Sequence, residues 1–152
     1  MLTNTAKTQT YLSNNKTHVY DFQEAINTIC KALTTRAKTH DASKLKEPEL
    51  TQYTEAAEKL EKFKPGSSDY LKIRDKYAII LSKHFTKNSH HPEHFKNGFN
   101  DMSILDLVDV LVDWKLDCGD GDWNKFVDDR RDYYGMSDQV VQIFKNSKDV
   151  LG

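Results

Sequence analysis

The sequence predicts an all-α fold: a single-domain bundle of about seven helices over residues 1–152. Apolar side chains recur every three or four residues in several long segments, as expected for helices with one buried face. Turn formers and helix-capping residues separate these segments. The length of 152 residues and the hydrophobic content of 38% suit one domain with one core.

The first strong helix is predicted over residues 17 to 33, after a polar, threonine-rich segment at residues 1–15. Its apolar stripe is Val19, Phe22, Ile26, Ile29, Cys30 and Leu33. Cys30 is expected in the core. An unbroken helix from His18 to His40 would hold these histidines roughly 33 Å apart, too far for one site. Threonines are poor helix formers, so a turn is predicted at residues 33–35.

Pro48 suits the first turn of the next helix. The apolar stripe of that helix, expected in the core, is Leu50, Tyr53, Ala57, Leu60 and Phe63. Residues 64–69 are the clearest loop, with Ser68 or Asp69 available to cap a helix over residues 70 to about 88. That helix directs His84 inward and should stop before Pro92. Residues 95–102 are predicted to be a loop.

A helix over about residues 103 to 116 carries an apolar stripe beside three carboxylates, Asp106, Asp109 and Asp113. Like charges on one helix face repel each other unless a metal or lysines lie between them. Asp106 is expected in solvent, and Asp109 and Asp113 are the candidate ligands. Residues 117–122 are a turn, and two C-terminal helices are predicted within residues 122–148, joined at Gly135.

The overall composition narrows the classes of function. The net charge of −1 lacks the basic field that non-specific nucleic-acid binding requires, so nucleic acid is not an expected partner. No apolar run approaches 18 residues and the start is not signal-like, so we expect no membrane segment and a cytoplasmic location. The two cysteines form no Cys-x-x-Cys pair and are expected as reduced thiols. The oligomeric state is left open.

The candidate site is centred on residues 40–44, His-Asp-Ala-Ser-Lys. By itself the His-Asp pair is compatible with a helix cap and a local ion pair. Five of the six histidines, however, lie in or between this segment and a later cluster that also contains Glu93. Imidazole and carboxylate together are the ligands expected for Zn, Fe, Mn or a mixed dinuclear centre. Lys44 is placed to pair with Asp41 or to bind a phosphate.

These motifs resemble a known superfamily. His18, His40-Asp41, the later histidines and Asp113 follow the order of the HD-domain metal-dependent phosphohydrolases. His40-Asp41-x-x-Lys44 and His90-His91-x-Glu93 are similar to motifs of the cyclic-dinucleotide phosphodiesterase branch. The spacings differ from that branch and its Gly-Tyr-Pro loop is absent, so cyclic dinucleotides are not indicated as substrate.

A closer resemblance is to a small, functionally uncharacterised family of phage and bacterial proteins. Its motifs are His-Asp-x-Ser-Lys, Asn-x-His-His, and an acidic residue four positions before Asp-Trp, here Asp109 and Asp113-Trp114. This resemblance covers about residues 11 to 116 and implies an HD-like helical bundle with its motif core at residues 17–116. If phage-encoded, the protein would act in the host cytoplasm.

The resemblance implies hydrolysis of a phosphomonoester or phosphodiester in a nucleotide or other phosphorylated small molecule. One or two divalent ions (Mn, Fe, Zn, Mg or Co) would activate water. The expected metal ligands are His18, His40, Asp41, His84, His91, Asp109 and Asp113. Asp113 is preferred over Asp109 because it matches the final aspartate of the superfamily pattern. Catalytic roles fall to Lys44, Asp41 and His90, and His90 and His94 are candidates for ligands or phosphate contacts. Glu49 is either an outer carboxylate of the site or a solvated helix acid.

An alternative function uses the same ligands differently. They could hold a purely structural metal in a helical binding module, such as a phage protein acting on a host factor. A structural metal is closed by four protein ligands, whereas a hydrolytic metal leaves a position for water or substrate.

Overall fold

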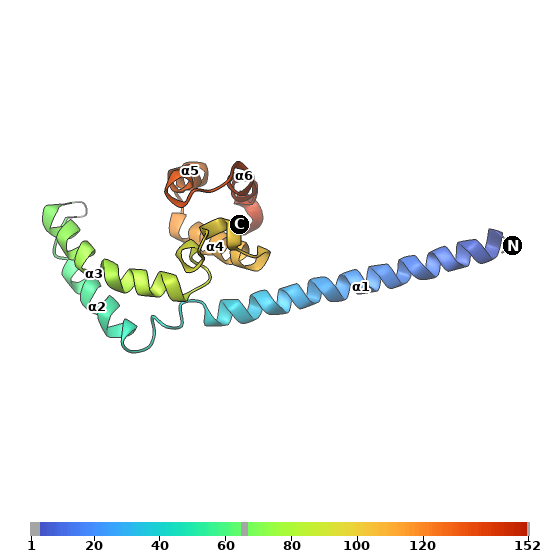
Figure 1. The fold of residues 1–152 in the computed structure, drawn as a ribbon, viewed down its shortest axis with the longest axis horizontal. Helices are drawn as coiled ribbons and strands as arrows, with labels where there is room; N and C mark the ends of the chain where they lie inside the picture. The colour runs from blue at the N-terminus through green and yellow to red at the C-terminus, as the bar shows by residue number, and fades with distance from the viewer. Residues whose placement is uncertain (1–3, 65–66, 152) are drawn as a thin grey trace. The chain divides into compact units, whose positions relative to one another are not determined.

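The computed structural model of the protein describes residues 4–64 and 67–151, in which the regular secondary structure is entirely helical. The α-helices are α1 (Asn4–Thr39), α2 (Glu49–Leu60), α3 (Ser68–Lys87), α4 (Ile104–Cys118), α5 (Trp123–Tyr134) and α6 (Asp138–Asn146) (Figure 1). Three short 3-10 helices are η1 (Pro92–His94), η2 (Gly98–Asp101) and η3 (Lys148–Leu151). The predicted all-α class is confirmed, with six α-helices in the described ranges where about seven were expected.

The chain divides into two compact units, Met1–Lys38 and Thr39–Gly152. The first unit consists of α1, a single helix that begins at Asn4 and not near residue 17 as predicted. The predicted turn at residues 33–35 is wrong, because α1 continues to Thr39. Within this helix the Thr34 hydroxyl donates to the Cys30 carbonyl and the Thr35 hydroxyl to the Lys31 carbonyl, each at 2.9 Å, so both hydroxyls have partners.

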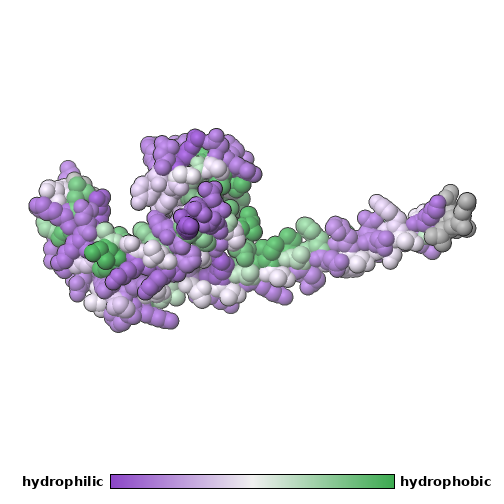
Figure 2. Space-filling view, viewed as in Figure 1, coloured by the Kyte–Doolittle hydropathy of each residue, from purple (hydrophilic) through white to green (hydrophobic). Residues whose placement is uncertain are grey.

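The apolar stripe of α1 does not lie in a core. Phe22, Ile26 and Ile29 are exposed, and Cys30 is exposed too, which corrects its predicted burial. Figure 2 shows apolar surface on the C-terminal half of α1 and mainly polar surface on its N-terminal half. No helix in the described ranges is both long and apolar enough to span a membrane.

In the second unit, α2 and α3 pack side by side as a hairpin (Figure 1). The predicted core stripe of α2 is only partly covered, since α2 contains no buried residue and Leu50 is exposed. Ser67, one residue before the predicted caps, accepts a hydrogen bond from the Tyr70 backbone N–H and begins α3. Pro65 and Gly66 of the predicted loop lie outside the described residues. The inward direction predicted for His84 is confirmed, because the histidine is fully buried.

The hydrophobic core of this unit joins η2 to the last three α-helices. Its centre is Phe99, Val110, Leu111, Trp114, Trp123, Val127, Met136, Val141 and Phe144. The indole N–H of Trp123 donates to the Phe144 carbonyl at 2.9 Å, so a buried polar group has its partner. Gly135, at φ +60°, ends α5 in the left-handed conformation that glycine tolerates best. This core supports α4, which carries Asp113 toward the candidate site.

Candidate metal centre

The His-Asp-x-Ser-Lys segment lies outside any helix. After α1 ends at Thr39, residues 40–45 form consecutive turns, in which the Lys44 N–H donates to the Asp41 carbonyl at 2.9 Å. Asp41 has φ +52°, in the left-handed region that aspartate occupies more readily than most residues. On a helix, His40 and Asp41 would have pointed about 100° apart. The turn removes that restriction.

Four side chains converge next to this turn. Asp41 meets His84 from α3 and His90 and His91 from the loop after α3, with one potential ligand atom of each within 4.8 Å of all the others. His84 Nε2 lies 2.9 Å from Asp41 Oδ1, and His90 Nε2 lies 3.2 Å from the same oxygen. His84 and His90 are buried. The described residues thus contain a His/Asp cluster that could hold a metal ion.

The same four atoms are buried without a hydrogen-bond partner among the described residues: Asp41 Oδ1, His84 Nε2, His90 Nε2 and His91 Nε2. Buried polar atoms normally have partners, so four orphaned atoms in one place require an explanation. With metal–ligand bonds of about 2.0–2.1 Å, neighbouring ligand atoms are about 2.9 Å apart in an octahedron and about 3.3 Å apart in a tetrahedron. The separations of 2.9 Å and 3.2 Å therefore fit a metal ion at the centre of the cluster.

Hydrogen bonds at the far side of His84 fix its orientation. His84 Nδ1 lies 3.1 Å from Glu49 Oε2, and the Ser43 hydroxyl donates to the same carboxylate oxygen at 2.7 Å. A carboxylate only accepts, so Nδ1 carries the proton and Nε2 presents its lone pair to the cluster. Asn88 Nδ2 also lies 3.2 Å from Nδ1 and donates to the His84 carbonyl at 2.7 Å, but the charged Glu49 carboxylate is the stronger partner of Nδ1. A carboxylate behind a ligating histidine is a common feature of metal sites.

The second oxygen of Asp41 faces a different set of groups. Lys44 Nζ donates to Asp41 Oδ2 at 2.5 Å, and His40 Nε2 lies 3.6 Å from this oxygen. His40 Nε2 is also 3.4 Å from Asp113 Oδ1. Burial alone would raise the pKa of Asp41, but the hydrogen bond and charge of Lys44, together with His40, lower it below its usual value. Asp41 therefore stays ionised, with His84 and His90 next to Oδ1 and with Lys44 and His40 next to Oδ2.

Burial controls the protonation of the paired histidines. It lowers the pKa of His90 to about 4 and that of His91 to about 3, with the neighbouring imidazoles acting in the same direction. Both rings are consequently neutral near pH 7, the form that binds a metal. Burial also raises the pKa of Asp113, and the nearby Asp117 adds to the effect.

The structure brings most predicted site residues together. His84, His90 and His91 join Asp41 in the cluster, while His40 and Asp113 lie beside it and Lys44 pairs with Asp41. His90 was expected to act in catalysis, yet its position is that of a ligand.

Four other candidates lie elsewhere. His18 lies within α1, and the turn on which its prediction depended does not form. Asp109 is half-buried on α4 and is not in the cluster. His94 is exposed, and its Nδ1 contacts the Thr86 carbonyl at 2.8 Å. Asp106, expected in solvent, is buried, because its carboxylate accepts hydrogen bonds from the Ser103 backbone N–H and hydroxyl in a capping box.

Two residues of the neighbourhood had weak sequence signals. Glu49 was weighed as an outer carboxylate, and its contact with His84 supports that reading. Tyr53 was interpreted only as a core residue. It lies one helical turn after Glu49, so the two side chains share a face of α2, and its ring lies 6.1 Å from the His84 ring. The spacing of four residues between Glu49 and Tyr53 was the sequence signal that could have placed Tyr53 near the site.

The family to which the chain belongs follows from a match over most of its length. The sequence model described as a family of unknown function, DUF5662, matches residues 7–149. The chain is a member of DUF5662. No curated protein and no solved structure matches this DUF5662 member. Its function must therefore be argued from the geometry of the Asp41 cluster.

Proposed function

We propose that this DUF5662 protein is a metal-dependent phosphohydrolase acting on a nucleotide or other phosphorylated small molecule. The observation that carries the proposal is that the two carboxylate oxygens of Asp41 face different sets of side chains. Its Oδ1 faces three imidazoles and its Oδ2 faces His40 and Lys44, with Asp113 adjacent to His40. A carboxylate shared in this way can bridge two divalent ions, an arrangement used for phosphoryl chemistry.

The donor types favour particular ions. Three imidazoles and one carboxylate suit Zn or Fe better than Mg, so the Asp41 cluster is the proposed position of the first ion. His40, Asp113 and Asp41 Oδ2 offer one imidazole and two carboxylates for a second ion, a set that suits Mn or Fe. Three protein donors from the described residues would leave room at this second position for water and a phosphoryl oxygen.

The roles of the side chains follow from these positions. Bound divalent ions would lower the pKa of water and polarise the phosphoryl group. Lys44, about one-third exposed and held by Asp41, can offset the negative charge that develops on the phosphoryl oxygens. Glu49 holds His84 in the tautomer that presents Nε2. Asp113, which lies next to His40, would serve as a ligand of the second ion.

One observation favours the alternative of a metal-stabilised binding module. The Asp41 cluster contains four protein donors, enough to close a tetrahedral zinc completely. A six-coordinate ion in the same cluster would keep two positions open. The coordination number of the bound ion therefore separates the two functions.

The test combines metal analysis with an activity panel. Purified protein is loaded with Zn, Fe or Mn, its metal content and coordination number are measured by elemental analysis and X-ray absorption, and it is incubated with p-nitrophenyl phosphate, its bis-ester and a set of nucleotides. We expect turnover with at least one ion and none after Asp41→Ala. A four-coordinate zinc with no turnover under any ion would overturn the proposal in favour of the binding module.

A further inference from the structure

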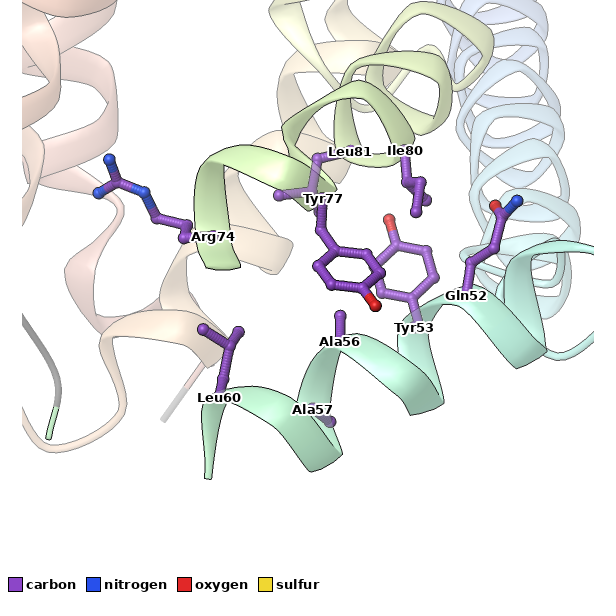
Figure 3. A pocket seen from close by; sticks show the side chains of 9 residues that line it. All are labelled: Gln52, Tyr53, Ala56, Ala57, Leu60, Arg74, Tyr77, Ile80 and Leu81. Atoms are coloured by element: carbon purple, nitrogen blue, oxygen red, sulfur yellow. The ribbon is translucent and has the colours of Figure 1, made fainter. Parts of the chain in front are cut away.

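A cavity of about 220 Å³ lies between α2 and α3. Figure 3 shows that the side chains around it come from the facing sides of the two helices. The residues that form its walls include Tyr53, Ala56, Ala57, Tyr77, Ile80 and Leu81. All of them lie in the second unit of the chain, as does the Asp41 cluster.

The sequence of the hairpin explains why a cavity forms there. Polar contacts hold the helices at both ends: Glu49 Oε2 lies 3.1 Å from His84 Nδ1, and Lys59 Nζ donates to the Tyr77 hydroxyl at 2.7 Å. Between these contacts α2 presents Ala56, whose methyl group is too short to fill the space. The fixed ends keep the helices apart, so the cavity does not collapse.

The interior of this cavity is apolar. Gln52 and Arg74 lie at its edges, and in Figure 3 their amide and guanidinium groups point away from it. An empty apolar cavity is unfavourable because its wall atoms lose van der Waals contacts. It is also a poor site for water, which needs polar partners, whereas apolar cavities of about 150 Å³ are known to accept benzene. An apolar ligand group of similar or larger size would fit.

Tyr53 borders both the cavity and the surroundings of the metal centre. It lines the cavity, yet its ring is 6.1 Å from the His84 ring, and Lys44 Nζ lies 5.6 Å from its centroid. The Tyr53 hydroxyl is buried with no hydrogen-bond partner among the described residues. A ligand that reaches from the cluster past Tyr53 would therefore meet an aromatic face, an unused hydroxyl and then apolar walls.

We propose that the cavity binds the aryl or branched-alkyl group of a phosphoester whose phosphoryl group lies at the metal centre. The position of the phosphoryl group rests on the proposed function. The walls select against the sugar of a phosphosugar or a nucleotide, because its hydroxyls would lose their hydrogen bonds to water and find few partners. Of the substrates in the proposed function, the cavity therefore favours a phosphorylated small molecule other than a nucleotide. Substrate preference would thus depend on the alcohol portion of the ester.

Binding measurements test whether the cavity holds the apolar group of the ligand, without relying on turnover. The metal-loaded full chain is titrated calorimetrically with phenylphosphonate and with methylphosphonate, which share the anionic group and differ in the apolar one. Ala56→Leu fills the cavity, and Ala78→Leu, on an exposed part of α3 outside its walls, is the matched control. We expect Ala56→Leu to raise the Kd of phenylphosphonate at least about tenfold, the scale of losing a buried apolar group, and to leave that of methylphosphonate within about twofold.

The other outcomes are also decisive. Equal weakening of both phosphonates, no weakening of either, or no binding to the wild-type protein would each overturn the inference. Ala57→Leu replaces Ala56→Leu if circular dichroism shows that the latter does not fold. Selective loss of phenylphosphonate binding, in a protein that hydrolyses no phosphoester under any ion, would support the cavity and contradict the proposed hydrolysis.

Discussion

His84 Nε2 and Asp41 Oδ1 lie 2.9 Å apart, although all of α2 and most of α3 separate them in the chain. Neither atom has a hydrogen-bond partner in the described residues. Because Glu49 fixes the proton of His84 on Nδ1, two lone pairs face each other across this gap. Two buried acceptors at that distance repel each other, and a cation between them turns the repulsion into coordination.

Asp41 should be the indispensable metal ligand. Asp41→Ala removes both carboxylate oxygens, so we expect elemental analysis after dialysis to find no bound ion. His40→Ala should keep one tightly bound zinc, because His40 lies outside the group of four donors. Full metal content in Asp41→Ala would contradict the site, and complete loss in His40→Ala would show that the first ion binds on the His40 and Asp113 side.

Glu49 should tune metal affinity from behind His84. Glu49→Gln weakens the acceptor for the Nδ1 proton and makes His84 a poorer ligand. Loss of such an outer carboxylate typically lowers metal affinity by about 10- to 100-fold, which a competition titration with a zinc chelator would measure. Glu58→Gln, at an exposed position of the same helix, serves as the control and should bind zinc as the wild type does. Equal affinities in the two variants would remove Glu49 from the site.

Lys44 should act on turnover and not on metal retention. Lys44→Met keeps the length of the side chain and removes its charge, so we expect metal content near wild type and turnover of a phosphoester lower by roughly 10². Lys46→Met, two residues later and exposed, is the matched control. Steady-state kinetics and elemental analysis on the same samples decide the matter. Wild-type turnover in a metal-loaded Lys44→Met protein would exclude a catalytic role.

The metal-free protein should lose stability as the pH falls below about 6.5. His90 and His91 have folded-state pKa values of about 4 and about 3, while an unfolded histidine titrates near about 6.5. Between these limits the unfolded chain binds more protons, so the free energy of unfolding decreases with falling pH. Urea denaturation at pH 7.5 and 4.5 measures the difference. His90→Gln/His91→Gln should show a smaller decrease, and an unchanged decrease would assign the effect to other groups.

Asp106 should stabilise the fold without affecting the metal. Its carboxylate accepts from the Ser103 N–H at 2.9 Å and from the Ser103 hydroxyl at 2.6 Å, which completes the capping box of α4. Asp106→Ala should lower the free energy of unfolding by about 1–2 kcal/mol, the scale of a lost N-terminal cap. Metal content should stay at the wild-type level. A metal-depleted but equally stable variant would reverse this assignment.

The sequence was sufficient to predict helices whose ends are marked by a capping residue or a glycine. The predicted start of a helix at about residue 103 is close to Ile104, where α4 begins after its cap Ser103, and Gly135 separates the last two α-helices as predicted. The failure in α1 has a specific cause. Threonine was treated as a helix breaker, whereas in this long helix Thr34 and Thr35 satisfy their hydroxyl groups on carbonyls one turn earlier.

The candidate site was predictable in its residue types and less so in its geometry. The density of histidines pointed to His84 and His91, and both lie in the cluster. His90 was left open as a ligand or a phosphate contact, and Asp106 was expected in solvent, because neither the path of the loop after α3 nor burial beside a helix cap can be read from spacing alone. The left-handed backbone at Asp41, which lets its carboxylate face two groups, also depends on tertiary context.

An ion bound by Asp41, His84, His90 and His91 would link two parts of the chain that are far apart in sequence. Asp41 precedes α2 and His91 follows α3, so an ion held between them would close the intervening segment into a ring. Closing a loop removes conformations from the unfolded chain and thereby favours the folded one. This gain in stability would apply to the segment that contains α2, a helix with no buried residue of its own. Chelation would then release α2 and α3 together, as one unit of hydrogen exchange, while the aromatic core formed by α4, α5 and α6 stays protected.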